Sequence, residues 1–307
     1  MTLIYEAQIA SQPAALREVL ARIVVPALDA RRPIVLCGLG TSLHACRVAA
    51  FWAAEVTGGA VRPAVVDAHE LALRAPLTLL DQIVVVSHRA RGFALTALAR
   101  ARAIGAHTIA VIGKGAAEPE ADCVLRTCDE ERADTHTVSY LCALAVLARL
   151  MATLGDDDSL AHALELVPDA IERTLTMPLP AVVSPILITG FATDAITATE
   201  AALKLKEGTR RWAEGMAVEQ ALHGPQAALR YGDTVVTIVP NDDGGRTPDL
   251  TAQAMDRGAR VLTAAADAGD LPFAKVPHLA RPFVTIVPFQ RWVAKIAREI
   301  GTNPDVM

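Results

Sequence analysis

The chain repeats itself, and this repetition constrains the fold more than any other feature. The segment PIVLCGLGTSLHACRVAA at residues 33–50 resembles PILITGFATDAITATEAA at residues 185–202, with a proline-led apolar strand, a glycine-containing turn, a small hydroxylated residue and an alanine-rich helix. A second pair of similar segments, at residues 81–113 and 232–265, follows in the same order. We interpret the halves as two copies of one doubly wound unit, because chance similarity between alanine-rich helices does not produce an ordered pair of matches.

Within each half, short runs rich in valine and isoleucine alternate with longer segments rich in alanine and leucine. This alternation is typical of a parallel sheet covered by helices on both faces, so the predicted fold class is α/β with two tandem doubly wound, flavodoxin-like parallel-sheet domains. In the first half we expect helices at residues 9–24, 42–56, 93–104 and 137–154, and strands at residues 33–37, 64–67, 82–87 and 107–112. We predict an N-terminal helical segment at residues 1–30, a first domain at 31–156 and a second at 157–307, separated by the acidic segment Asp156–Ser159.

Charge and hydropathy exclude several classes of protein. A net charge of −5, with 29 basic and 34 acidic residues spread along the chain, provides no basic patch for nucleic acid or an acidic membrane. The apolar runs, such as residues 34–36 and 235–239, stop far short of the ~18 residues of a membrane span, so we expect buried strands. Residues 1–25 lack the order of a secretion signal, which predicts a cytoplasmic protein. Five cysteines without metal-ligand spacing are expected to be free thiols.

The first candidate site is the turn Gly38-Leu39-Gly40-Thr41-Ser42, which follows a predicted strand and opens a predicted helix. Backbone N–H groups and the helix dipole favour an anion at such a place. The turn is not a dinucleotide fingerprint, because Leu43 stands where that motif requires a third glycine, and the chain has no nucleotide P-loop. As an alternative, Ser42 would simply be the N-cap of the helix.

The second candidate is the segment Ser87–Gly92 at the carboxyl end of a predicted strand, where open α/β sheets place their ligands. A hydroxyl group on Ser87, the imidazole of His88 and the guanidinium groups of Arg89 and Arg91 fall within five residues. As an alternative, these are ordinary solvated loop residues.

The third candidate is a helical segment with charged residues on one face. Glu200, Lys204 and Glu207 stand at i, i+4 and i+7, so their side chains point in similar directions from a helix of 3.6 residues per turn. The less specific interpretation is an exposed helix with one supporting Glu-to-Lys pair. Further along the chain, His223 precedes Gly-Pro.

Together these motifs resemble those of the sugar isomerase (SIS) family. The sequences GLGTS, EAALKLKE and LHGP, with a serine at the end of the next central strand, occur in the order found in that family, and His223 stands sixteen positions after Glu207. The chain is similar to the isomerase half of glucosamine-6-phosphate synthase and to its fructosamine deglycase and amino-sugar isomerase relatives. The resemblance covers residues 33–303.

The resemblance implies a role for each matching residue. The glutamate at Glu207 would move the proton between adjacent sugar carbons, and the histidine at His223 would help to open the sugar ring from a second subunit, which implies a homodimer with shared sites. Lys204 would lie near the reacting oxygen atoms, while Ser42 and Ser87 would bind the sugar phosphate. These roles fit an enediol reaction, which needs a base, an acid and a nearby cation but no metal and no organic cofactor.

Three departures from the family limit what the resemblance implies. The family's Ser-Gln-Ser-Gly-x-Thr phosphate cradle survives only as Ser87, and we hypothesise that Arg89 replaces the lost hydroxyl groups as an anion ligand. No glutamine-hydrolysing domain precedes the repeat, so we do not expect amino-sugar synthesis from glutamine. The sequence GTNPDVM replaces the family's lysine-bearing tail, so a Schiff-base step that relies on that lysine is not implied.

The sequence therefore predicts an aldose–ketose isomerase, or a deaminase or deglycase, that acts on a small anionic sugar such as a phosphosugar. The alternative is a sensor module that binds the sugar phosphate without catalysis. The predicted catalytic residues are Glu207, His223, Lys204 and Glu200, and the predicted substrate-binding residues are Ser42, Thr41, Gly40, Ser87, His88 and Arg89. We expect neither nucleic-acid nor membrane partners.

Overall fold

The computed structural model describes residues 3–307, and these fall into two compact units. The N-terminal unit contains residues 14–131 and 137–165. The C-terminal unit contains residues 166–307, together with the residues up to Pro13 and the short segment 132–136. Each unit contains its own five-stranded sheet, and each is described separately below.

The N-terminal unit is built around a wholly parallel sheet with the strand order β2-β1-β3-β4-β5. This is the order of a flavodoxin-like doubly wound fold. Its elements are β1 (Ile34–Gly38), α2 (Thr41–Val56), β2 (Ala64–Asp67), α3 (Ala68–Leu73), β3 (Gln82–Val86), α4 (Phe93–Ile104), β4 (His107–Ile112), β5 (Cys123–Arg126), α5 (Val138–Ala152) and α6 (Ser159–Glu165). Helix α1 (Ile4–Arg22) contributes its residues after Pro13.

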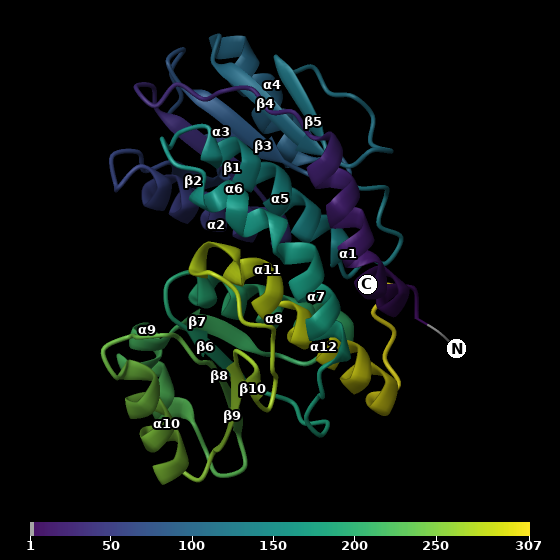
Figure 1. Ribbon diagram of the computed structural model, residues 1–307, viewed down its shortest axis with the longest axis vertical. Coiled ribbons are helices and arrows are strands. Elements are labelled where there is room, and N and C mark those ends of the chain that lie inside the picture. Colours follow the sequence, from purple (N-terminus) through teal and green to yellow (C-terminus); the bar gives the residue numbers. More distant parts are fainter. Residues whose placement is uncertain (1–2) are drawn as a thin grey trace. The chain divides into compact units, whose positions relative to one another are not determined.

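Helices cover both faces of this sheet. Helices α3 and α4 pack together on one face, while α2 and α5 pack together on the other (Figure 1). On the α3–α4 side, the apolar strand residues Val35, Ile83 and Val85 meet Leu71 and Leu98 in a buried core. The central strands β1 and β3 are therefore buried on both sides, which explains why their sequences are continuous apolar runs.

The C-terminal unit repeats this plan. Its sheet has the order β10-β9-β8-β6-β7, in which the first four strands in sequence are parallel and the two-residue strand β10 pairs antiparallel with β9 at the edge. Its elements are α7 (Val167–Thr176), β6 (Leu187–Gly190), α8 (Thr193–Thr209), β7 (Glu214–Ala217), α9 (Val218–Leu222), η1 (Pro225–Ala228), β8 (Thr234–Ile238), α10 (Arg246–Asp256), β9 (Arg260–Ala265), β10 (Ala268–Gly269), η2 (His278–Ala280), α11 (Arg281–Thr285) and α12 (Val287–Ile300).

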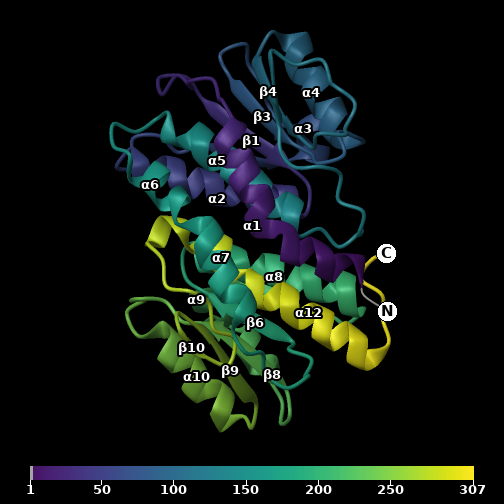
Figure 2. The ribbon, with the colours of Figure 1, turned by 45° about the vertical axis from the view of Figure 1, so that its right-hand side comes forward.

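The helices of this unit also divide between the two faces of the sheet. Helices α9 and α10 pack together on one face, and α8 packs with α11 and α12 on the other (Figure 2). Leu187, Val218, Val235 and Leu250 form a buried core on the α9–α10 side. Helix α8 is the counterpart of α2, because each follows the first strand of its sheet.

The predicted fold class is confirmed, and several elements match the prediction closely. The strands at 64–67 and 107–112 and the helix at 93–104 have the predicted limits. One detail of the prediction was wrong, because the short strand β10 pairs antiparallel with β9. None of the helices within residues 3–307 combines the length and the hydropathy that a membrane span requires.

Candidate functional site

The first two sequence motifs meet at one edge of the N-terminal sheet. Strands β1 and β3 are parallel neighbours, with Cys37 opposite Val85, so the turns that follow them lie at the same carboxyl edge. The helices that leave these turns, α2 and α4, go to opposite faces of the sheet. This is the switch point where open α/β sheets form a ligand crevice. The fold therefore brings the turn at 38–42 and the segment 87–92 side by side.

The turn after β1 has a backbone that favours glycine. Gly40 has φ 52° and ψ −125°, in the left-handed half of conformational space, and α2 begins at the next residue, Thr41. Ser42 is therefore the second residue of the helix and not its N-cap, so the N-cap alternative was wrong. A Cβ atom on Gly38 would lie only 2.7 Å from the carbonyl carbon of Ser42, so this glycine permits the close approach of helix and strand.

The segment after β3 turns its histidine inward. The backbone N–H of Glu131 donates to Nε2 of His88 over 3.0 Å, and the ring lies against Gly113, where a Cβ atom would be 2.7 Å from His88 Cε1. Burial lowers the pKa of His88 below its usual 6.5, while the charge of Glu131 opposes this effect. His88 is thus a neutral acceptor with its proton on Nδ1.

Arg89 turns in the same direction. Its Nη2 donates to the carbonyl oxygen of Glu131 over 3.3 Å, and the residue is half-buried, so the alternative that Arg89 is a solvated loop residue was wrong. With His88, Gly113 and Glu130, it lines a small pocket of about 160 Å³. His88 and Arg89 therefore face the 130–131 segment at the β4 side of β3.

Glu131 is an organising residue that we did not identify from the sequence. Its buried carboxylate accepts hydrogen bonds from the N–H and hydroxyl of Thr137 over 2.6 and 2.7 Å, and from the N–H groups of Val138 and Ser139 over 3.1 and 2.9 Å. It thus caps the N-terminus of α5 while its own N–H holds His88. The sequence gives no local signal, because Glu131 is six residues before the first hydroxyl that it contacts.

The third motif forms a buried cluster of charges on α8. Lys204 Nζ lies 2.6 Å from Glu207 Oε2 and 3.5 Å from Glu200 Oε1. The side chains of Glu200 and Lys204 are 0% and 1% exposed, whereas that of Glu207 is 19% exposed. One carboxylate therefore anchors the ammonium group in the interior, and the other remains accessible beside it. In such a cluster the accessible carboxylate can exchange a proton with a ligand, while the ammonium group stabilises negative charge on an oxygen atom of that ligand.

The C-terminal tail packs against the end of α8 that carries Glu207. Thr302 Oγ1 donates to the carbonyl oxygen of Gly208 over 2.9 Å, and Arg210 donates to the carbonyl oxygens of Glu207 and Val306. The carboxylate of Asp305 accepts hydrogen bonds from the first N–H groups of α1 over 2.9 and 2.7 Å. The sequence GTNPDVM therefore helps to fix the backbone near Glu207.

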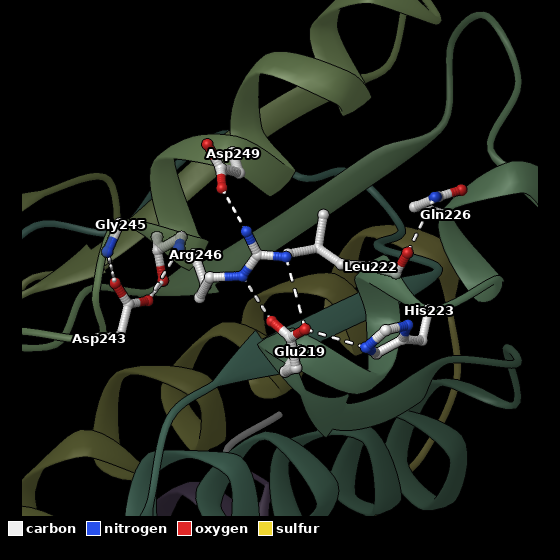
Figure 3. A network of polar contacts seen from close by, with 9 residues as sticks. Glu219, Leu222, His223, Gln226, Asp243, Gly245, Arg246 and Asp249 are labelled. Atoms are coloured by element: carbon white, nitrogen blue, oxygen red, sulfur yellow. Dashed lines mark hydrogen bonds and ion pairs between the residues drawn. The ribbon is translucent and has the colours of Figure 1, made fainter.

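His223 lies elsewhere in the same unit. It follows α9, on the face of the sheet opposite α8, and its side chain is 71% exposed. A turn at Gly224, with φ 138°, follows it, and Gln226 Nε2 donates to the carbonyl oxygen of Leu222 over 3.1 Å (Figure 3). Within one chain, the C-terminal unit therefore does not bring His223 together with Glu207.

In the second copy, an internal ion pair occupies the place that corresponds to the turn at 38–42. Ala192 occupies the place of Gly40, and Asp194 occupies that of Ser42. The buried carboxylate of Asp194 lies 2.5 Å from Arg281 Nη2, which also donates to the carbonyl oxygen of Val239 over 3.1 Å. Strands β6 and β8 correspond to β1 and β3, and Val239 follows β8 as Ser87 follows β3. Arg281 therefore bridges the carboxyl ends of β6 and β8 by contacting Asp194 after the first strand and Val239 after the second.

Comparison with known proteins shows which proteins this chain is similar to. No family model matches the chain. The glutamine–fructose-6-phosphate aminotransferase (isomerizing) of Bradyrhizobium diazoefficiens is 30% identical over 309 residues, which include 89% of this chain and 50% of that protein. The chain spans about half the length of the curated relatives it matches.

Solved structures show the same fold. The C-terminal domain of glucosamine-fructose-6-phosphate aminotransferase from Francisella tularensis matches with a TM-score of 0.84 and 18% identity, covering 99% of this chain and 98% of that one. Glucosamine-6-phosphate deaminase from Thermotoga maritima matches with a TM-score of 0.80 and 18% identity, covering 98% and 96%. This chain thus has the fold of the C-terminal domain of such an aminotransferase, and its sequence is similar to the isomerase (SIS) portion of these relatives.

Proposed function

We propose that this protein is an aldose–ketose isomerase, or an amino-sugar deaminase or deglycase, that acts on a phosphosugar. The observation that carries the proposal is the cluster on α8, in which Lys204 lies between the buried Glu200 and the accessible Glu207. A module that only senses a sugar has no need of an accessible base beside a buried cation. The names of the relatives, which include an aminotransferase that isomerises fructose 6-phosphate and a glucosamine-6-phosphate deaminase, support the same class of substrate.

The proposed chemistry assigns the proton transfer to Glu207. Its carboxylate takes a proton from the carbon beside the substrate carbonyl, the C–H electrons form a carbon–carbon double bond, and the carbonyl electrons move to their oxygen to give an enediolate. The proton of the neighbouring hydroxyl passes to that oxygen, and the Glu207 carboxyl returns its proton to the former carbonyl carbon, so that the carbonyl re-forms at the neighbouring position. Lys204 stabilises the negative charge that develops on the oxygen atoms, and Glu200 holds the ammonium group in place. This chain's own side chains supply each of these groups.

The proposed anion-binding residues lie in the two turns at the carboxyl edge of the N-terminal sheet. Gly40, Thr41 and Ser42 present the start of α2, and Ser87 lies at the end of the neighbouring strand. Arg89 remains a proposed ligand of the phosphate, although it is already hydrogen-bonded to Glu131 and would have to share or exchange that contact. We retain residues 31–156 and 157–307 as the proposed limits of the two domains.

We further propose a cytoplasmic homodimer in which His223 completes the site of the partner subunit. The position of His223 supports this arrangement, because it lies on the opposite face of the sheet from Glu207 and its side chain is largely exposed. The histidine would exchange a proton with the ring oxygen of the sugar during ring opening.

The test combines binding and chemistry. A thermal-shift panel of hexose, hexosamine and fructosamine 6-phosphates and their unphosphorylated analogues selects the ligand, since binding to the folded state raises apparent stability. Incubation of that ligand in deuterium oxide then measures exchange at the carbon beside the carbonyl. We expect tighter binding of a phosphorylated sugar and enzyme-dependent exchange. Binding without any exchange would instead support the sensor.

Glu207→Gln tests the base directly. The substitution keeps the shape of the side chain and removes the proton acceptor, so we expect exchange to be lost and the thermal shift to be retained. Glu214→Gln is the matched control, because Glu214 is an exposed glutamate at the start of β7. Exchange by Glu207→Gln at the wild-type rate would exclude Glu207 as the base.

Shared sites are tested by mixing two inactive variants. A hybrid of His223→Ala and Glu207→Gln subunits contains one site with both native residues, so about a quarter of wild-type activity should return when half of the dimers are hybrids. Hybrid dimers that form and remain inactive would contradict the shared site.

A further inference from the structure

The imidazole of His223 is held by a neighbour on its own helix. Nε2 of His223 lies 3.0 Å from Oε1 of Glu219, one turn earlier on α9 (Figure 3). Because a carboxylate accepts hydrogen bonds only, Nε2 must donate, and a neutral ring then has its lone pair on Nδ1. The arrangement therefore specifies which of the two ring nitrogens can exchange a proton with a ligand.

Glu219 is fixed in turn from the neighbouring helix. Nε of Arg246, the first residue of α10, lies 2.5 Å from Glu219 Oε2, and Nη1 of the same guanidinium lies 2.6 Å from Asp249. Asp243 caps α10 by accepting hydrogen bonds from the N–H and hydroxyl of Thr247, over 2.8 and 2.6 Å. The start of α10 thus has a defined backbone from which Arg246 reaches Glu219 (Figure 3).

The arginine also sets the charge of this glutamate. The hydrogen bond from Arg246 holds the pKa of Glu219 below its usual 4.5, and the neighbouring His223 lowers it further. The charged groups that face the histidine and its partner are therefore Glu219 on α9, Arg246 and Asp249 on α10, and Asp243 before α10. Glu219 remains a carboxylate throughout the neutral range and cannot donate to the imidazole.

We propose that Glu219 is a positioning residue, which holds His223 with Nε2–H bound to its carboxylate and presents Nδ1 as the nitrogen that exchanges protons with the sugar. Arg246 supports Glu219 in this role. The proposal rests on the proposed function of His223 in ring opening and adds the residue that orients it. The competing explanation is that the network only joins α9 to α10, as surface ion pairs do, with little effect on stability.

The test compares two substitutions of one residue. Glu219→Ala removes the acceptor, whereas Glu219→Gln removes the charge and keeps an amide oxygen that can still accept from Nε2. Asp249→Ala is the matched control, because it removes a carboxylate from the same network without touching the hydrogen bond to His223. Nitrogen-15 NMR of labelled histidine, at a pH where the ring is neutral, reads the protonation of each ring nitrogen directly.

For the wild type and Asp249→Ala we expect an unprotonated Nδ1 and a slowly exchanging proton on Nε2. In Glu219→Ala this proton should exchange rapidly and the Nδ1 signal should move to an average of the two tautomers, with Glu219→Gln largely restoring the wild-type spectrum. A wild-type ring that carries its proton on Nδ1, or a Glu219→Ala spectrum identical to that of the wild type, would overturn the proposal.

Kinetics on the ligand selected by the binding panel provide the second readout. We expect Glu219→Ala to lower kcat about tenfold with KM nearly unchanged, since orientation of an acid–base group acts on the transition state, and Glu219→Gln to recover much of the loss. An unchanged kcat in an active enzyme would overturn the positioning role. If no sugar is turned over at all, the proposed function fails, whereas the NMR measurement still decides whether Glu219 orients His223.

Discussion

Ala192 has the same backbone conformation as Gly40, its counterpart in the first copy. Ala192 has φ 51° and ψ −124°, and Gly40 has φ 52° and ψ −125°. An L-residue in this region suffers steric strain of about 1–3 kcal/mol, because its Cβ atom meets the neighbouring peptide groups. We therefore predict that Ala192→Gly stabilises the protein.

The size of the effect follows from two opposing terms. Relief of strain contributes about 1–3 kcal/mol, while the greater freedom of glycine in the unfolded chain costs about 0.4–1 kcal/mol. Ala192 is exposed, so the loss of its methyl group removes little packing. The expected net gain in the free energy of unfolding is about 0.5–2 kcal/mol.

Urea unfolding measures this gain as a shift of the midpoint at constant slope. Ala252→Gly provides a matched control, since Ala252 is exposed inside α10 and its replacement should lower stability by about 1 kcal/mol. The reverse change, Gly40→Ala, should lose about 0.5–2 kcal/mol, because it places the same strain in the first copy and the lower freedom of alanine in the unfolded chain offsets part of it. If Ala192→Gly destabilises the protein as much as Ala252→Gly does, the strain argument is refuted.

Three further predictions concern stability and are measured by the same unfolding assay. Lys204→Met should cost about 3–5 kcal/mol because it removes the cation beside a buried carboxylate, whereas Lys206→Met, which loses a contact 5.0 Å above the ring of Trp212, should cost about 1 kcal/mol or less. Glu131→Gln should lose about 1–3 kcal/mol, because the amide nitrogen replaces an oxygen that accepts from α5. Burial lowers the pKa of His88, so the unfolded chain binds a proton more readily than the folded one; stability should be complete above about pH 6.5 and decrease as the pH falls below it, and His88→Asn should remove this slope.

The fold was largely predictable because its strands leave a local signal. The central strands are buried on both faces, so runs such as Ile83–Val86 are continuous and apolar, and the repeat provides a second example of the pattern. Strand β5 (Cys123–Arg126) was missed because it lies at the edge of the sheet and is only partly buried. Its four residues contain two aliphatic side chains, which is too few to form a pattern.

The candidate site was predictable only where its residues share one helix. Helical spacing alone places Glu200, Lys204 and Glu207 on one face, and the structure brings them into direct contact. By contrast, the orientation of His88 depends on Gly113, which lies on the next strand. The support of His223 depends likewise on Arg246, 27 residues after the glutamate that it contacts. Such partners are set by tertiary packing, so no local pattern in the sequence indicates them.

The two copies have changed in different directions at their equivalent corners, and the difference has a physical consequence. The first copy keeps glycine and two hydroxylated residues, Thr41 and Ser42, where α2 begins. In the second copy the carboxylate of Asp194 occupies the corresponding place at the start of α8, where it pairs with Arg281. Burial raises the pKa of Asp194, and the charge of Arg281 opposes this effect. The ionised form of the Asp194 carboxylate therefore depends on the arginine beside it.

In the second copy, the carboxylate of Asp194 lies in the first turn of α8 and already contacts Arg281. An external anion would bind more weakly there, because it would have to compete with this carboxylate. The corner of the second copy therefore serves to fix the start of α8, while the same helix presents Lys204 and Glu207 more than two turns later. Duplication of one unit has thus produced two different uses of one geometry. The first copy keeps the turn that we propose as an anion site, whereas in the second copy the Asp194–Arg281 pair occupies the same place and anchors the helix that carries the charged cluster.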